Sequence, residues 1–286
     1  MFTCLTGECR NSQDPKLSQV LDCDNYYVGL TEAPGCAHRM ASLRAKQPKA
    51  PGFVTELQGG WFATIGGALS DDHYSDARHF NAIHWMSLLG GAGGLTPYVF
   101  VGGTHFGNWG SRGQTTSYDY NAGIREWGAR GSKYSVAQGV AQFIHENEAQ
   151  LLRAEGGPCE IKDAPKSLFG GVRIAPDGTR FVFLLNNDPT QPAAGKATLV
   201  PGQIAKPSAP IYNIDQNGNQ VLIQTGDAAA GRLTLAPFEV SYDLPPLGAG
   251  ALVIPPGKSP AKGIWYPKPQ REITRPALCR IPFYAA

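Results

Sequence analysis

The sequence predicts an α/β region followed by an all-β region: a partial (β/α) barrel of about four βα units, then an antiparallel β-sandwich-like domain. In the first half, short apolar runs alternate with helical patterns, which is typical of parallel strands joined by helices. After Gly157, short strand-like runs alternate with turn residues. With 286 residues and 42% hydrophobic content, the chain is large enough to bury a core in each region.

The first region is expected to span residues 1–156. Short β-branched, aromatic and aliphatic runs predict strands at residues 1–5, 26–30, 52–55 and 97–101. Helical spacing predicts helices at residues 37–46, 72–89 and 133–154, with Ser70 as N-cap of the second and Gly156-Gly157 as C-cap of the third. A complete barrel needs eight units and roughly 250 residues, so half a barrel is expected.

The second region is expected to span residues 157–286. Strands are predicted at residues 167–174, 180–185, 197–199, 221–224, 232–235 and 240–244. Turn residues such as Asn217-Gly218 separate them, which favours antiparallel pairing. From Pro255 onward the chain is rich in proline, which predicts an extended tail.

Charge and apolar runs exclude several classes of partner. A formal net charge of +2, with acids and bases intermixed, leaves no basic stripe for nucleic acid. The longest apolar runs are far shorter than the roughly 20 residues that span a bilayer. The first residues do not resemble a signal peptide, so a cytoplasmic location is the default expectation and the compartment stays open.

Metal and cofactor sites are not expected either. The six cysteines have no C-x2-C spacing and are interpreted mostly as buried thiols, although one bridge among the first four stays open. His73, His79 and His84 are not spaced to present two imidazoles on one helical face. Phosphate-binding and dinucleotide-binding motifs are absent from the sequence, so no cofactor is predicted.

Three sequence blocks carry a resemblance to a known family. They read TELQGGWF at residues 55–62, YVFVGGTHF at residues 98–106 and TTSYDY at residues 115–120. In order and spacing they resemble glycoside hydrolase family 35, the β-galactosidases, over roughly residues 1–155. The resemblance implies the last four strands of a TIM-type barrel, so the chain is expected to be truncated. It also implies a β-galactoside or oligosaccharide substrate.

Glu56 is the candidate nucleophile. It follows a predicted interior strand, and the carboxyl ends of parallel barrel strands carry the chemistry. A helix cap or a rim ion pair is the alternative from the residues alone, but the resemblance matches Glu56 to the family's nucleophile. Retaining enzymes place a second carboxyl group about 5 to 5.5 Å away. The family's asparagine-glutamate pair has no match here, which leaves Glu32 and Glu8 as candidate acid/base residues or as solvated loop carboxylates.

Four more residues are candidate sugar contacts. Tyr98 and Tyr120 match family tyrosines that contact galactose or the nucleophile, although either could instead pack in the core. Trp61 could stack on a sugar or be structural. Gln58 stands where some relatives have an aromatic residue, which puts the substrate range in doubt.

The resulting hypothesis is a retaining β-galactosidase-type glycoside hydrolase, impaired if no acid/base residue replaces the missing one. The alternative is a catalytically inactive, truncated relative that binds a sugar or another protein. Under both hypotheses an unclosed half-barrel leaves free strand edges, so a homo-oligomer is expected.

Overall fold

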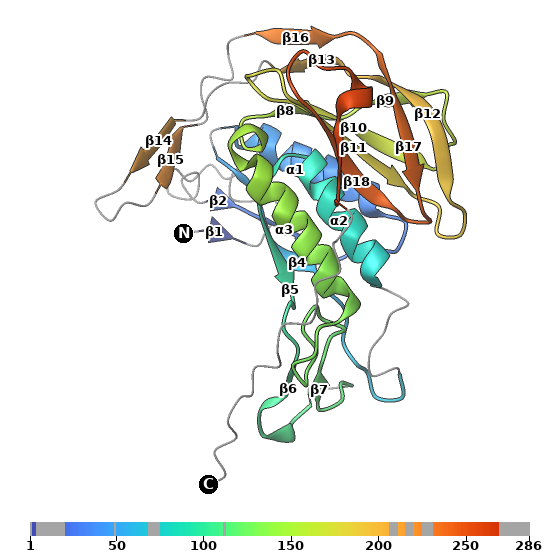
Figure 1. Cartoon of the computed structure of the whole chain (residues 1–286). Helices are drawn as coiled ribbons and strands as arrows, with labels where there is room; N and C mark the ends of the chain where they lie inside the picture. Colours follow the sequence, from blue (N-terminus) through green and yellow to red (C-terminus); the bar gives the residue numbers. More distant parts are fainter. Residues whose placement is uncertain are drawn as a thin grey trace, which may run out of the picture.

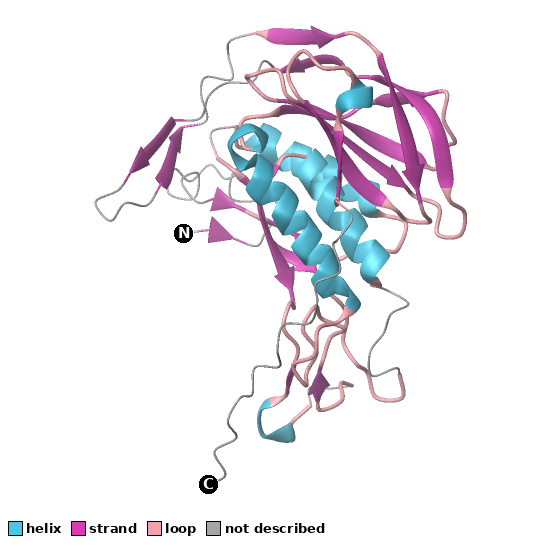
Figure 2. Cartoon of the chain, in the orientation of Figure 1, coloured by secondary structure: helices cyan, strands magenta, loops and turns pink. Residues whose placement is uncertain are grey.

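The computed structural model describes residues 2–3, 21–48, 50–67, 75–110, 113–205, 211–214, 220–224 and 231–268. It shows a mixed α/β architecture in which helices lie between a small parallel sheet and a set of antiparallel sheets (Figures 1 and 2). Glu8, Ser70 and His73 lie outside the described residues.

The parallel sheet has the order β3-β4-β5, formed by Asp24–Tyr26, Gly52–Gln58 and Ala92–Tyr98. A further parallel pair joins β1 (Phe2–Thr3) to β2 (Leu21–Asp22), which immediately precedes β3. The parallel pairing agrees with the predicted βα units. The helices of this region are α1 (Ala33–Lys46), α2 (Ala77–Leu89) and α3 (Ser132–Leu151).

Two strands lie earlier in the chain than predicted. The strand expected at 26–30 instead spans Asp24–Tyr26, where Arg39 binds one oxygen of the buried Asp24 carboxylate at 2.5 Å. The strand expected at 97–101 is the glycine-rich β5, which ends at Tyr98. Glycine is needed there because a Cβ on Gly94 would lie 2.2 Å from the ring of Phe53 on β4.

Both predicted helix caps were wrong. Helix α2 begins at Ala77, where the Asp76 side chain accepts the His79 backbone N–H at 2.9 Å, so Asp76 rather than Ser70 is the N-cap. Helix α3 ends at Leu151. Gly156 and Gly157 instead lie in β8 (Glu155–Pro158), because their backbones pair with β10.

The described part of the β-rich region contains two larger antiparallel sheets and two two-stranded antiparallel pairs. The five-stranded sheet has the order β19-β18-β11-β10-β8, and the three-stranded sheet has the order β17-β12-β9. Their strands, besides β8, are β9 (Glu160–Lys162), β10 (Leu168–Ile174), β11 (Arg180–Asn186), β12 (Ala193–Val200), β17 (Phe238–Leu244), β18 (Ala249–Ile254) and β19 (Ile264–Tyr266). The pairs are β13-β16 (Gly202–Ala205, Arg232–Leu235) and β14-β15 (Ile211–Ile214, Gln220–Gln224). Both larger sheets contribute to one apolar cluster.

The prediction of an extended tail from Pro255 was wrong for its described part. A 3-10 helix, η3 (Pro260–Lys262), is followed by β19, which pairs with β18. Strand β18 was itself missed, although all six of its residues are buried. Residues beyond 268 lie outside the description.

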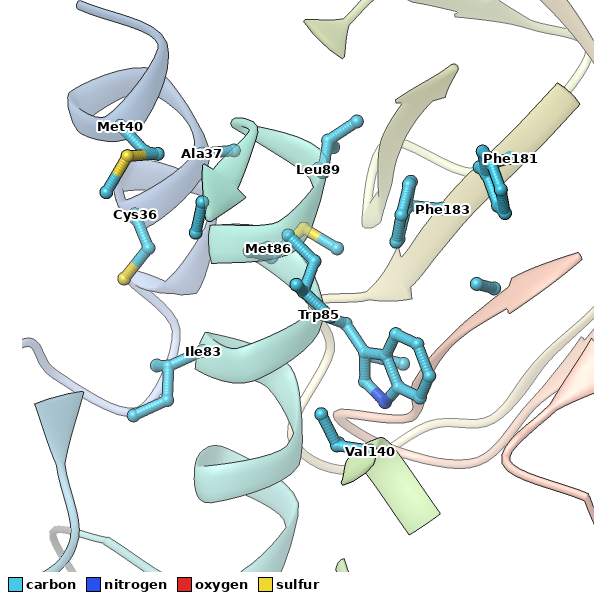
Figure 3. Close-up of a cluster of buried hydrophobic side chains, with 14 of the residues drawn as sticks. Cys36, Ala37, Met40, Ile83, Trp85, Met86, Leu89, Val140, Phe181 and Phe183 are labelled. Carbon is cyan, nitrogen blue, oxygen red and sulfur yellow. The ribbon is translucent and has the colours of Figure 1, made fainter. Parts of the chain in front are cut away.

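Helix α2 is the centre of the main core (Figure 3). Ten of its 13 residues are buried, because β4 and β5 lie on one side and β10, β11 and β18 on the other. Trp85 is fully buried, with ring centroids 4.9 Å from Phe143 of α3 and 6.4 Å from Phe183 of β11. The helical and β-rich regions therefore share one hydrophobic core rather than meeting at a polar interface.

A buried arginine also joins the two regions. Arg173 of β10 donates to the carbonyl oxygens of Leu88, Leu151 and Ala154 at 3.0, 3.0 and 2.7 Å. These carbonyls lie at the carboxyl ends of α2 and α3, where a cation is favourable. Burial lowers the pKa of Arg173 to about 9, which still leaves it charged at neutral pH.

Candidate active site

Glu56 lies near the carboxyl end of β4, and its carboxylate is half-buried. Tyr27, the first residue after β3, donates its hydroxyl to Glu56 Oε2 at 2.7 Å. Because β3 and β4 are parallel and adjacent, their carboxyl ends meet at one edge of the sheet. The sheet thus places the phenol and the carboxylate side by side.

Tyr27 is a permanent hydrogen-bond donor in this arrangement. Desolvation and the hydrogen bond to Glu56 raise its pKa well above the ordinary 10.0. Because 37% of Tyr27 remains exposed, nearby water reduces the effect of desolvation on its pKa. The hydrogen bond to Glu56 is therefore the better-supported cause of the upward shift. The phenol therefore stays protonated over the whole physiological range and keeps Glu56 as its acceptor.

Three tyrosines form a wall beside this pair. The hydroxyl groups of Tyr98 and Tyr118 are hydrogen-bonded at 2.7 Å. Tyr120 stacks on Tyr118 with centroids 5.5 Å apart and meets Tyr98 edge-on at 5.7 Å. Burial raises the pKa of Tyr120 to about 12, and the charge of Glu56 contributes to the upward shift of both Tyr118 and Tyr120. The wall thus lies within electrostatic range of the candidate nucleophile.

Trp61 and Phe62 connect the pair to the wall. The Trp61 ring packs edge-on against Tyr27 at 5.9 Å and against Phe62 at 5.6 Å. Phe62 in turn meets Tyr120 at 5.1 Å. Trp61 is 37% exposed, so it forms part of the rim. The structure therefore brings together Glu56, Trp61, Tyr98 and Tyr120.

The loop that carries Tyr118 and Tyr120 is fixed by one ion pair and by hydrogen bonds. Both oxygens of the buried Asp119 carboxylate accept hydrogen bonds from Arg125. Burial is the largest single effect and raises the pKa of Asp119, but the hydrogen bonds from Arg125 and from backbone N–H groups, together with the charge of Arg125, outweigh it and lower the pKa. Ser117 donates to Glu126 at 2.5 Å, and the short pair β6-β7 (Gly103–Thr104, Ser117–Tyr118) closes the hairpin. Tyr118 and Tyr120 flank the anchored Asp119.

The Gly59-Gly60 pair allows the end of β4 to approach this loop. A Cβ on Gly60 would lie 1.4 Å from the Tyr120 carbonyl oxygen, so only glycine fits there. The buried Lys133, at the start of α3, donates to the Gly59 carbonyl at 2.8 Å and to Ser75 Oγ at 3.3 Å. The position of the strand end is thus set by α3 as well as by the sheet.

The remaining candidates lie less directly at the carboxylate. Gln58 is buried, and its Oε1 accepts the Val28 N–H at 3.0 Å, so this side chain ties β4 to the segment after β3. Glu32 is exposed, and its Oε2 accepts the Gly29 N–H at 2.7 Å within its own turn. It stands just before α1. Glu8 lies outside the described residues, so its position is not part of this geometry.

Sequence reasoning missed Tyr27, Tyr118 and Phe62. Tyr118 lies inside the TTSYDY block and alternates with Tyr120, so the motif itself could have indicated it. Tyr27 was placed inside a strand, whereas the strand ends one residue earlier.

The described residues hold no cluster of three or more potential metal-ligating side chains. No helix in the described part of the chain is long and apolar enough to cross a membrane.

The first half of the chain matches a known protein family. Residues 2–144, half of the chain, match the model of glycosyl hydrolases family 35. Probable beta-galactosidase B of Aspergillus fumigatus is 33% identical over 101 residues, which are 34% of this chain and 10% of that protein. Beta-galactosidase of Mus musculus is 31% identical over 108 residues, 36% and 16% of the two chains.

A longer alignment has lower identity. Probable beta-galactosidase C of Aspergillus niger is 24% identical over 234 residues, 80% of this chain and 23% of that protein. A solved GH27 β-L-arabinopyranosidase from Geobacillus stearothermophilus aligns over 83% of this chain and 45% of its own, with 7% identity and a TM-score of 0.41. The alignments span 10%, 16% and 23% of the three β-galactosidase relatives. On the family match, the chain belongs to glycosyl hydrolase family 35.

Proposed function

We propose that this chain carries the nucleophile side of a retaining β-galactosidase-type active site, with Glu56 as the nucleophile. The observation that carries the proposal is the Glu56 carboxylate, hydrogen-bonded to Tyr27 at 2.7 Å beside a wall of neutral tyrosines. The relatives' names supply the substrate class, a terminal β-galactoside. The family's partial TIM-type barrel, followed by a sandwich-like domain, is the architecture that we infer for the site's setting.

The chemistry follows from the chain's own groups. One Glu56 oxygen forms a bond to the anomeric carbon as the glycosidic bond breaks, and the departing oxygen takes a proton from an acid. Water then cleaves the glycosyl–Glu56 ester, which returns the carboxylate and retains the anomeric configuration. Tyr27 holds one carboxylate oxygen, so the other is left for attack. Tyr98 and Trp61 are the proposed sugar contacts, whereas Tyr120 and Gln58 are buried and are proposed to position the carboxylate and the strand that carries it.

The acid/base residue is the second part of the proposal. Glu32 follows the strand next to that of Glu56, but its carboxylate accepts a backbone N–H in its own turn. To act as the acid, it would have to leave that contact. Glu8 stays as the second candidate. Loss of general acid assistance costs about 10²- to 10⁴-fold in rate, so an activated aryl galactoside is the proper test substrate.

The experiment compares hydrolysis of nitrophenyl β-galactoside by the wild type, Glu56→Gln and Glu32→Gln, with Glu148→Gln on the exposed face of α3 as matched control. Glu56→Gln is expected to lower turnover by at least about 10⁴-fold. A 2-deoxy-2-fluoro-galactoside should label the peptide that contains Glu56, as detected by mass spectrometry. Glu32→Gln should slow natural galactosides more than the aryl substrate.

Turnover that survives in Glu56→Gln, or a label on another carboxylate, contradicts the assignment. Absence of turnover in the wild type favours the alternative, a relative that binds a sugar or a protein without catalysis.

A homo-oligomer is also part of the proposal. Within the described sheet β5 pairs with β4 on one side only, so its other edge could pair with a second copy. Light scattering tests for that second copy.

A further inference from the structure

The β-rich region contains an open hollow of about 300 Å³ that the proposed catalytic site does not use. It lies between β17 and β19 and is lined by Ser241, Tyr242, Asp243 and Trp265. Each of these strands is the outermost strand of its sheet in the described part of the chain. In Figure 1, β17 belongs to the β-rich end of the molecule, away from the β6-β7 hairpin that carries Tyr118.

The aromatic wall of this hollow is held firmly. Trp265 is half-buried and pairs in register with Leu252 of β18. The next residue, Tyr266, packs edge-on against Phe143 at 5.1 Å and donates its hydroxyl to Glu146 of α3. The pairing with β18 and the contacts of Tyr266 therefore fix the strand that carries the indole, as a preformed site requires.

The other wall combines a buried and an exposed face of β17. Tyr242 is 6% exposed and lies in register with Gly195 of β12. Ser241 and Asp243 are exposed. A carboxylate accepts hydrogen bonds only, and a serine hydroxyl both donates and accepts. One wall thus offers polar groups and the other an apolar ring.

This combination matches the chemistry of a sugar. A pyranose has an apolar face that packs on an indole and hydroxyl groups that donate to a carboxylate. The single carboxylate disfavours anions, and the described residues hold no cluster of three metal-ligating side chains at this or any other place. About 300 Å³ lies at the lower end of ligand-pocket volumes, which suits one ring rather than a long oligosaccharide.

We propose that the hollow between β17 and β19 is a second, non-catalytic binding site for one neutral pyranose residue. Trp265 supplies the stacking surface, and Asp243 and Ser241 bind the hydroxyl groups. All four lining residues belong to the β-rich region, so the site does not depend on Glu56. A single ring with few contacts is expected to bind with a dissociation constant on the order of 1 to 10 mM.

The test uses the indole N–H signals of the five tryptophans in a ¹H–¹⁵N correlation spectrum of the full chain. The signal that disappears in Trp265→Phe reports on the hollow, and the signal that disappears in Trp61→Phe reports on the catalytic site. Methyl β-D-galactopyranoside is titrated into the wild type. The Trp265 signal is expected to shift and to saturate as the sugar concentration rises. Its dissociation constant should differ from the one that the Trp61 signal reports.

Two conservative variants of β17 provide the specificity control. Asp243→Asn removes a hollow-lining charge, whereas Glu239→Gln removes an exposed carboxylate that pairs with Lys196 outside the hollow. Asp243→Asn should weaken the Trp265 response about 10-fold, and Glu239→Gln should leave it unchanged. If the Asp243→Asn variant does not fold, Ser241→Ala tests the same wall of the hollow.

The outcomes separate this site from the proposed catalytic function. A Trp265 signal that stays still while the Trp61 signal moves overturns the second site and leaves the catalytic proposal intact. A Trp265 shift without a Trp61 shift supports the second site and counts against the catalytic one. Equal weakening by Asp243→Asn and Glu239→Gln also overturns the second site, because binding would then not depend on the hollow.

Discussion

The two regions use their strands in opposite ways. In the β-rich region, strands such as β18 are buried along their whole length, and their side chains serve packing. In the parallel sheet, β4 packs Val54 and Leu57 into the core but presents Glu56 at its end. The difference shows where a fold of this kind can place chemistry: at strand ends, where the next loop supplies hydroxyl groups instead of apolar side chains.

The regions are nevertheless one packing unit. Trp85 of α2 contacts Phe183 of the five-stranded sheet, and Arg173 of that sheet binds the ends of α2 and α3. The contrast between the regions is therefore one of surface chemistry and not of independent folding.

The largest effect on stability is expected from Arg173→Met. The variant leaves three buried helix-terminal carbonyls without their donor, which should cost about 3 to 5 kcal/mol of unfolding free energy. Arg232→Met, on an exposed arginine of β16, is the control. Urea unfolding followed by near-UV and far-UV circular dichroism should give coincident transitions for the wild type. Separate transitions would show that the two regions fold independently.

Acid is expected to destabilise the helical region through two buried histidines, each with a smaller effect than that of Arg173→Met. Burial lowers the pKa of His79 and of His84 from 6.5 to about 4. Between pH 6.5 and about pH 4 the unfolded chain binds more protons than the folded one. The unfolding free energy is therefore highest above about pH 6.5 and falls as the pH drops toward 4. The loss is roughly 3 kcal/mol per histidine.

The measurement is the urea midpoint at pH 7.5 and at pH 4.5. His84→Gln, which keeps a donor for the Phe80 carbonyl, should lose less stability over this interval than the wild type. His38→Gln, an exposed position on α1, should behave as the wild type. A pH dependence that His84→Gln does not change would assign the effect to other groups.

The smallest effect is expected from Tyr27→Phe, which tests the side chains at the strand ends of the parallel sheet. It removes one hydrogen bond to a charged group, worth about 1.5 to 3 kcal/mol, so kcat/KM for nitrophenyl β-galactoside should fall about 10- to 100-fold. The loss should lie mainly in kcat, because the hydrogen bond would orient the proposed nucleophile, Glu56. Tyr134→Phe, on α3, is the matched control. Equal losses in both variants would mean that Tyr27 acts only through packing.

The sequence predicted the elements better than their ends. Glu56 follows a β-branched run and stands near a strand end as expected, because local propensity and the glycine pair agree there. Tyr27 was missed because an apolar run, Tyr26 to Leu30, outweighed a strand whose aspartates are satisfied by distant partners such as Arg39. Strand β18 was missed because glycine and proline surround it. The role of Arg173 depends on three carbonyls from distant segments, which no local pattern encodes.

Helix α3 fixes a distance between two places with different tasks. It has 20 residues and is therefore about 30 Å long. Near its start, Lys133 holds the backbone just after Glu56, and near its end, Glu146 receives Tyr266 and Lys268 beside the strand of Trp265. The helix therefore ties the strand of Trp265 and the backbone that follows Glu56 to one rigid element, at contact points 13 residues and about 20 Å apart along its axis.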